Sequence, residues 1–412
     1  MFAKTAFIGA IGAVWLMSAT ARGDAIVEWN IKADAIGADK GLNPPLQART
    51  LSLVHVSIFE AVNAIERRYT PYKLQLTAER PASAEAAAAS AGYEALVSLH
   101  PDLRKDLDAT LMKLLADIPE GPERKNGIAL GKKAAAGMLA LRANDGSGVT
   151  ESYRPFTKPG VYVPTTMVAS STVGGFTPWV MKSGSQFRPA PPPALDSPKW
   201  TRDVNEIREI GGLHSTRRTS EQTDIGRFWI ITGGRSWNPV VRQVAHLKTP
   251  DIVDRARLFA LVSVATADAM IAVFDAKYAF NFWRPVTAIR NADQTGNAST
   301  PRDPTWLPLA DTPMHPEYPC AHCISSSAAA TVLQALVGDS PGEITMTSAS
   351  APAVTRKWTR LQDYSDEVSS ARIYAGFHYR FSTEVGKDMG RKIGELTVKT
   401  QMQPLSGAGS SR

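Results

Sequence analysis

The sequence predicts an all-α protein in which two helical bundles pack as a single unit. Apolar residues recur at spacings of three and four between residues 46 and 143, which is the period of a helix buried on one face. Helix signals return after residue 200, and few stretches alternate apolar and polar residues as strands do, so we expect little sheet. The composition, 43% hydrophobic and 21% charged, suits a folded chain rather than a disordered one.

The first bundle is expected within residues 46–143, after an N-terminal arm at residues 22–45. The stretch Leu51–Ile65 places apolar side chains three and four residues apart, as an amphipathic helix does. Three further helices are expected, at residues 82–99, 103–118 and 128–141. Successive antiparallel helices of this kind form a bundle.

A long irregular connection, residues 144–199, separates the two bundles. Gly, Pro, Ser and Thr dominate it, and Pro189 and Pro191 lie close together. Connections of this length are uncommon in compact domains and are often functional. Its apolar residues, among them Phe176 and Trp179, favour a loop packed on the surface over a flexible linker.

The second bundle, residues 200–400, carries the candidate site, and residues 401–412 form a tail. Thr249-Pro250-Asp251 has the composition of a helix start, with Thr249 as the capping residue and Pro250 in the first turn. That helix is expected to run through Val273. Further helices are expected at residues 324–337, 354–374 and 384–400.

Residues 1–21 have the pattern of a secretory signal peptide. Lys4 precedes an apolar run from Thr5 to Met17, and Ala19-Thr20-Ala21 supplies small residues for cleavage. We therefore expect a periplasmic or secreted protein. The alternative, a membrane anchor, needs about 20 apolar residues. No later stretch is interpreted as long and apolar enough, so no membrane span is expected after signal removal.

The formal net charge is +7, and the basic residues are scattered in pairs such as Arg67-Arg68 and Lys132-Lys133. Because there is no basic stripe interleaved with aromatic residues, nucleic acid is not expected as a partner. A positive charge weakly favours anionic small molecules as substrates. Nothing in the sequence indicates an oligomeric state.

The first of three segments that can carry chemistry runs from Lys277 to Pro285. Lys277 and Arg284 are seven residues apart, about two helical turns, so they are expected on nearly the same helix face. Pro285 disfavours helical geometry at Arg284, so the helix should end there and leave Arg284 free to turn toward a site. The alternative is a solvated pair of cations that compensates the helix dipole.

The second segment is Pro319-Cys320-Ala321-His322-Cys323. Proline at the mouth of a helix leaves the following backbone N–H groups unpaired, and a helix N-terminus of this kind binds anions. His322 in the first turn can act as a general acid or base; the alternative is a capping or core histidine.

The third segment contains Arg372 and His378. The two residues are six apart and converge only if the helix breaks between them, which Gly376 permits. Ser382 is interpreted as the N-cap of the final helix.

Together the segments predict a pocket for a tetrahedral or trigonal-bipyramidal oxyanion. Arginines bind equatorial oxygens in forked geometry, and a lysine adds a point charge. One histidine can bond to the central atom, and the other can protonate the opposite axial oxygen.

These segments resemble the three-part signature of the vanadium haloperoxidase and type-2 phosphatidic acid phosphatase (PAP2) superfamily. That signature is Lys-x6-Arg-Pro, then Pro-Ser-Gly-His, then Ser-Arg-x5-His-x3-Asp, and all five charged or histidine positions match in order. Residues 48–65 and the length of the chain are similar to the bacterial haloperoxidase-like branch. The resemblance implies a helical-bundle enzyme with vanadate as cofactor, or phosphate in the same site.

The resemblance also implies roles for individual residues. His378 would be the axial vanadium ligand, or the phosphohistidine nucleophile of a phosphatase, and His322 would be the acid–base residue. The residues implied to hold the oxyanion are Lys277, Arg284, Cys320, Ala321, His322, Arg372 and His378.

Three functions remain open. The first is oxidation of halide with hydrogen peroxide at a histidine-ligated vanadate. The second is hydrolysis of phosphate monoesters through a phosphohistidine. The third is a non-catalytic oxyanion-binding or redox-sensing protein on the same scaffold.

The chain departs from the signature at Cys320 and Ala321, which replace Ser and Gly. A thiol is a poorer hydrogen-bond donor than a hydroxyl, and peroxide would oxidise a thiolate among cations. Either Cys320 and Cys323 form a disulfide, or the protein performs no peroxide chemistry. A thioredoxin-like pair, a zinc site and a cysteine phosphatase are alternatives, but the chain lacks the βαβ context, the further ligands and the nearby arginine that they need.

Ser382 stands where the signature has an aspartate, which would orient His378. If this position caps a helix, Ser and Asp serve alike. If it fixes the tautomer of His378, the loss of the acid should weaken that residue as a ligand or nucleophile.

Overall fold

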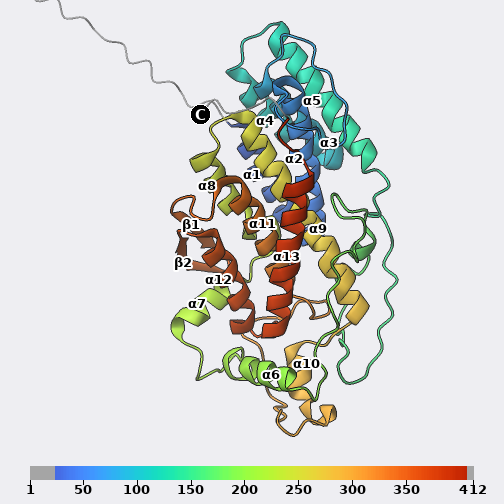
Figure 1. Cartoon of the computed structure of the whole chain (residues 1–412), viewed down its shortest axis with the longest axis vertical. Helices are drawn as coiled ribbons and strands as arrows, with labels where there is room; N and C mark the ends of the chain where they lie inside the picture. The colour runs from blue at the N-terminus through green and yellow to red at the C-terminus, as the bar shows by residue number, and fades with distance from the viewer. Residues whose placement is uncertain (1–23, 406–412) are drawn as a thin grey trace, which may run out of the picture.

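The computed structural model describes residues 24–405 and confirms the all-α prediction (Figure 1). This part of the chain forms 13 α-helices and one two-stranded antiparallel hairpin. The predicted signal peptide, residues 1–21, lies outside the described residues.

The first bundle contains five helices. Its Ala-rich helix α3 packs against α5 and α2, because small side chains let the backbones approach closely. A Cβ atom added to Gly131 of α5 would lie 2.5 Å from the carbonyl oxygen of Ala87 on α3. The five helices are α1 (Ala25–Asp39), α2 (Pro44–Glu66), α3 (Ala84–Leu99), α4 (Arg104–Ala116) and α5 (Pro122–Leu141).

The expected N-terminal arm at residues 22–45 is wrong, because most of it is helix α1. Asp24 caps this helix by accepting hydrogen bonds from the backbone N–H groups of Ile26 and Val27. Trp29 is fully buried and donates from Nε1 to the carbonyl oxygen of Ala89 at 3.0 Å. Several polar residues of α1 are buried by pairing with other helices, which hides the apolar periodicity in the sequence.

The second bundle is built around the long helix α9 (Ile252–Phe280), which also packs on α2 of the first bundle. Figure 1 shows α9 and the C-terminal helix α13 running through the middle of the molecule. The other bundle helices are α11 (Ala321–Val337), α12 (Leu361–Tyr374) and α13 (Arg380–Thr400). Shorter helices surround them: α6 (Pro198–Ile210), α7 (Ser220–Phe228), α8 (Asn238–Lys248) and α10 (Pro285–Arg290).

Helix α9 corrects the statement that no later stretch is long and apolar enough to cross a membrane. An 18-residue window within it has a mean hydropathy of 1.8, which meets the length and composition of a span. In the folded chain 94% of that window is buried. The helix is therefore apolar on all sides because protein surrounds it on all sides.

Two helix predictions in the second half need correction. Residues 354–358, expected to begin a helix, belong to strand β2 (Ala351–Trp358), which pairs with β1 (Ile344–Ser348). Thr249 does not cap α9; it follows the end of α8, and Asp251 caps α9 by accepting from the N–H of Val253. Both errors come from local signals that neighbouring elements override.

The irregular connection is packed, as predicted. The carboxylate of Asp268 on α9 is fully buried and accepts hydrogen bonds from the backbone N–H groups of Trp179, Val180 and Met181 at 2.6 to 2.8 Å. Burial raises the pKa of Asp268 to about 6, and the three backbone donors act in the opposite direction. These bonds fix the connection against the helix that leads to the site.

The predicted tail also begins as ordered structure. The backbone N–H of Thr70 donates to the carbonyl oxygen of Gln403 at 2.8 Å, and Met402 is buried. Residues 401–405 therefore join the C-terminal end to the first bundle.

Candidate oxyanion-binding site

Lys277 and Arg284 reach the same site from different elements. Lys277 lies in the last turn of α9, which ends at Phe280, and Asn281 follows in the left-handed region with φ 50°. The helix thus ends four residues earlier than predicted, and Arg284 is the residue that precedes α10. Both side chains are buried, at 0% and 1% exposure, so the alternative of a solvated pair of cations is wrong.

The two cations donate to one segment of backbone. Lys277 Nζ donates to the carbonyl oxygens of Pro316 and Glu317 at 2.9 and 2.7 Å. Arg284 Nε donates to the carbonyl oxygen of His315 at 2.9 Å, and its Nη1 donates to that of Phe377 at 3.0 Å. Residues 315–317 accept three of these four bonds and Phe377 accepts the fourth, so the backbone around the site holds both cations in place.

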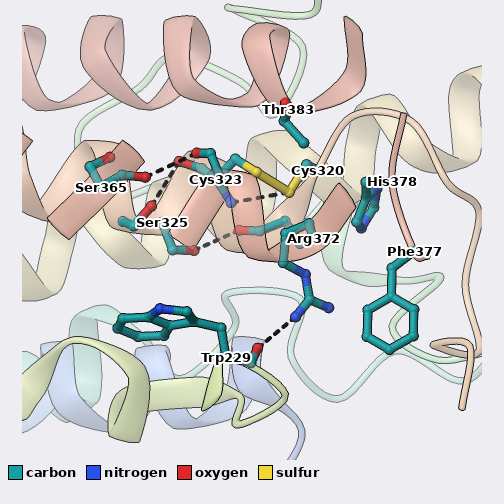
Figure 2. Close-up of a disulfide and its surroundings, with 12 residues drawn as sticks. Trp229, Cys320, Cys323, Ser325, Ser365, Arg372, Phe377, His378 and Thr383 are labelled. Carbon is teal, nitrogen blue, oxygen red and sulfur yellow. Dashed lines mark hydrogen bonds between the residues drawn. A yellow bond between two sulfur atoms is a disulfide. The ribbon is translucent and has the colours of Figure 1, made fainter. Parts of the chain in front are cut away.

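Arg372 comes from the end of α12, and the predicted helix break is confirmed. The helix ends at Tyr374, and Gly376 adopts φ 79°, a conformation that favours glycine. Arg372 Nη1 donates to the carbonyl oxygen of Trp229 at 2.6 Å, as Figure 2 shows. Within residues 24–405 its Nε is buried and has no hydrogen-bond partner. An unpaired buried guanidinium donor is costly, so this N–H is suited to an incoming anion.

Burial lowers the pKa of all three cations. The pKa of Lys277 falls well below its ordinary value through burial and then through the charge of Arg284. Burial lowers the pKa of Arg284 to about 10 and that of Arg372 to about 9. The site is thus a concentration of positive charge that an anion would stabilise.

Helix α11 begins at Ala321, three residues before the expected range of 324–337, and His322 lies in its first turn as predicted. Cys320 is the N-cap, and its Sγ accepts from the N–H of Cys323 at 3.2 Å. The N–H groups of Ala321 and His322 are in the first turn, where a helix offers them no backbone partner, and both residues line the cavity.

Cys320 and Cys323 form a disulfide, and these are the only two cysteines in the chain (Figure 2). Both are fully buried. Sulfur in a disulfide has no proton to donate, so Cys320 cannot replace the serine hydroxyl of the signature as a donor. Backbone N–H groups therefore supply the donors at this position.

His322 is held in one tautomer. Its Nε2 lies 2.9 Å from the carbonyl oxygen of Ile231, which can only accept, so Nε2 carries a proton. Burial, followed by the charge of Arg372, lowers the pKa of His322 well below its ordinary value. The ring is thus neutral, and its lone pair lies on Nδ1.

His378 lies between a cation and a carboxylate. Its Nε2 is 3.2 Å from Arg284 Nη1, and its Nδ1 is 2.7 Å from Glu317 Oε1. Burial, followed by the charges of Arg284 and Lys277, lowers the pKa of His378 well below its ordinary value. The structure therefore brings together four residues that were predicted from two separate segments: Lys277, Arg284, Arg372 and His378.

Sequence reasoning missed two residues of the site, Glu317 and His315. Glu317 is fully buried, and burial raises its pKa to about 7 against the opposing charges of Lys277 and Arg284. Nδ1 of His315 lies 3.0 Å from Arg284 Nη2, which can only donate, and 3.1 Å from the carbonyl oxygen of Pro316, which can only accept. The signal was present: both ionisable residues lie within five positions of Cys320, in a stretch rich in proline.

The interpretation of Ser382 as an N-cap is wrong. Helix α13 begins at Arg380 with Tyr379 as its N-cap, and the N–H of Ser382 donates to the carbonyl oxygen of Tyr379 at 3.0 Å. Ser382 is fully buried next to the site, and its hydroxyl helps to lower the pKa of Glu317.

A cavity of about 100 Å³ opens onto these groups. Its polar lining includes Arg372, His315, His322 and His378. Its apolar lining includes Pro44, Trp237, Met270, Phe274 and Pro313. Within residues 24–405 no group of three or more His, Cys, Asp or Glu is arranged to hold a metal ion.

Comparison with known proteins agrees with this geometry. The family model of the VCPO second helical-bundle domain matches residues 257–407, which include all five charged or histidine positions. The crystal structure of a bacterial vanadium-dependent iodoperoxidase superposes with a TM-score of 0.79 at 25% sequence identity, covering 93% of this chain and 97% of that one. These matches, in the site-bearing part of the sequence and in the fold of the whole chain, support the vanadium haloperoxidase superfamily.

Two further members of the superfamily are similar. Vanadium chloroperoxidase from Curvularia inaequalis is 26% identical over 360 aligned residues. The match covers 67% of this chain, and the chain spans only 58% of that protein's length. The holo form of a bacterial vanadium-dependent chloroperoxidase shares the fold, with a TM-score of 0.67 at 16% identity over 86% of this chain and 92% of that chain.

Proposed function

We propose that this protein is a vanadium-dependent haloperoxidase that oxidises halide with hydrogen peroxide. The observation that carries the proposal is the charge balance of the site. Lys277, Arg284 and Arg372 are buried around His378, and Glu317 is the one carboxylate hydrogen-bonded to that histidine within residues 24–405. Three buried cations beside one carboxylate leave positive charge without a partner, and this favours the binding of an anion.

The residues present fit vanadate. The unprotonated Nε2 of His378 would be its protein ligand, and Lys277 and Arg372 would bind its oxygens together with the N–H groups of Ala321 and His322. The buried, unpaired Nε of Arg372 gives independent support, because it lacks an acceptor. Bound vanadate would supply the activation of peroxide.

His322 is placed to hold or move a proton. Because Nε2–H is bonded to the carbonyl oxygen of Ile231, the atom that can accept a proton is Nδ1. Its lowered pKa keeps the ring neutral, so we propose that His322 acts as the general base toward the oxyanion side of the cavity.

The disulfide supports a reaction that uses peroxide. With Cys320 and Cys323 joined, the chain has no thiol for peroxide to oxidise. The iodoperoxidase and chloroperoxidases named above act on different halides, so the test below uses iodide, bromide and chloride.

The test is halogenation of an acceptor dye with peroxide and iodide, bromide or chloride, with and without added vanadate. We expect turnover that depends on vanadate and is lost in His378→Ala. As a matched control, Arg391→Ala removes an exposed arginine on α13 and should leave turnover unchanged. Absence of halogenation with all three halides would overturn the proposal.

A second candidate, hydrolysis of phosphate monoesters, is favoured by the unprotonated Nε2 of His378, which could attack phosphorus. It uses the same oxyanion donors. Release of phosphate from p-nitrophenyl phosphate that His378→Ala abolishes, without any halogenation, would select this reaction instead.

We also propose that residues 1–21 direct export. Expression in a bacterium followed by mass spectrometry of the purified chain should give a mature N-terminus at or near residue 22. Recovery of the full-length chain from the cytoplasm would contradict this.

A further inference from the structure

Within residues 24–405 a single carboxylate contacts His378, and it does not come from the position that the family signature assigns. Glu317 lies in the segment before α11, three residues before Cys320. Its Oε1 accepts from His378 Nδ1 at 2.7 Å and from the backbone N–H of Tyr379 at 3.2 Å. The signature position is occupied by Ser382, which cannot act as an acid.

The contacts at both ends of the His378 ring define one tautomer. Arg284 has only donors, so its Nη1 at 3.2 Å requires Nε2 to be an acceptor. In a neutral ring the proton is then on Nδ1, where Glu317 accepts it. The lone pair of His378 is thus on Nε2, the nitrogen that a bound oxyanion centre would need.

Glu317 is itself held rigidly. Its backbone N–H donates to the carbonyl oxygen of Phe282 at 2.8 Å, and its carbonyl oxygen accepts from Lys277 Nζ at 2.7 Å. Its side chain is fully buried. The carboxylate therefore has little freedom to leave His378.

We infer that Glu317 is the positioning residue that fixes the ring and the Nδ1–H tautomer of His378. It replaces, from a different element, the acid that Ser382 lacks. The inference rests on the proposed function only where it concerns binding at Nε2. The geometry of the Glu317–His378 pair holds for either reaction at this site.

Glu317→Gln separates positioning from simple electrostatics, because it keeps the shape of the side chain and removes its charge. Removal of a negative charge from the cation cluster should by itself strengthen the binding of any anion. Loss of a group that orients a metal ligand typically weakens metal affinity about 10- to 100-fold. The two effects have opposite signs for an anion that bonds to His378.

The experiment compares two probes by calorimetry. Vanadate can bond to His378, whereas sulfate is held by charge and hydrogen bonds alone. For Glu317→Gln we expect vanadate affinity to fall at least tenfold, while sulfate affinity stays the same or rises. In a His378→Ala background the same substitution should not weaken vanadate binding further. Equal or tighter vanadate binding by folded Glu317→Gln would overturn the inference.

A second measurement needs no ligand and no turnover. Nitrogen-15 chemical shifts of labelled histidines, with His378 assigned by comparison with His378→Ala, report which ring nitrogen carries the proton. We expect Nδ1–H in the native protein. A predominant Nε2–H tautomer would overturn the inference even if vanadate binds. If no halide is oxidised but Nδ1–H is found and vanadate affinity falls as expected, the proposed reaction fails and the role of Glu317 stands.

Discussion

A Cβ atom added to Gly386 would lie 2.7 Å from the carbonyl oxygen of Cys320. Helix α13 therefore passes directly against the N-terminus of α11, where the proposed oxyanion donors begin. Gly390, one turn further on, makes the same kind of close approach to the carbonyl oxygen of Ile324. The absence of side chains along this seam sets how deeply the start of α11 lies in the protein.

Gly386→Ala should displace the start of α11. Overpacking of a tight contact typically costs about 1–3 kcal/mol, so we expect a lower unfolding midpoint and weaker sulfate binding. Chemical unfolding and calorimetry measure the two effects. Gly148→Ala is the matched control, since nothing lies within 4 Å of its added Cβ, and it should change neither quantity. Unaltered stability in Gly386→Ala would contradict the tight packing of α13 against the start of α11.

Replacing both cysteines by serine should have opposite effects on stability and binding. Loss of a disulfide that closes a loop of four residues costs about 2 kcal/mol in the chain-entropy model. The hydroxyl that Cys320→Ser introduces can donate where the disulfide cannot, so vanadate affinity should rise. Urea unfolding and calorimetry test both halves. Reduced stability together with unchanged affinity would mean that the side chain at position 320 does not face the oxyanion.

Arg372→Ala should weaken sulfate binding by about 10- to 100-fold, because hydrogen bonds to charged groups contribute about 1.5–3 kcal/mol. Arg372→Lys should recover only part of this, since lysine lacks the forked donors. The exposed Arg391→Ala serves as the control. If Arg372→Ala binds sulfate as tightly as the native protein, Arg372 does not bind the anion.

Low pH should destabilise the fold because His55, which lies away from the site, becomes protonated on unfolding. His55 is fully buried, and burial, followed by the charge of Arg242, lowers its pKa to about 3. Because the folded pKa lies below the unfolded value of 6.5, this contribution to stability is present above pH 6.5 and is lost as the pH falls toward 3. The loss between pH 7 and 4.5 should be about 3 kcal/mol.

His55→Gln removes the titration while keeping an acceptor for the Nδ2 of Asn30, which lies 2.9 Å from His55 Nε2. The free energy of unfolding, measured in urea at pH 7 and 4.5, should fall less in this variant than in the native protein. His246→Gln, at an exposed position on α8, should keep the native pH dependence. Equal slopes for His55→Gln and the native protein would exclude His55 as the cause.

Asp268→Asn should release the irregular connection. The amide has one acceptor oxygen for three backbone donors and places an N–H₂ group against them, so proteolysis within residues 144–199 should accelerate. Asp275→Asn is the informative comparison. Asp275 contacts the same connection through the partly exposed Arg188, and pairs of that kind contribute about 1 kcal/mol or less. Similar protease resistance in Asp268→Asn and the native protein would contradict the role of Asp268.

The sequence predicts most of the helices and the five charged or histidine positions of the candidate site, because spacing and helix ends are local properties. The break at Gly376 is an example, since Arg372 and His378 can meet only if the backbone adopts a conformation suited to glycine. Helix α1 was missed because its pattern depends on contacts with distant residues. Its buried polar residues are satisfied by other helices, and no local pattern reveals those partners.

Glu317 illustrates the difference between what the sequence determined and what the tertiary structure decided. The sequence alone determined an all-α fold and the residue types of the candidate oxyanion site. Only the tertiary structure brought Glu317 to His378 and joined Cys320 to Cys323 in a buried disulfide. It also left the start of α9 capped by Asp251 rather than Thr249. The physical reason is that periodicity and helix signals act over a few residues, whereas the partner of a buried polar group is set by how distant elements pack.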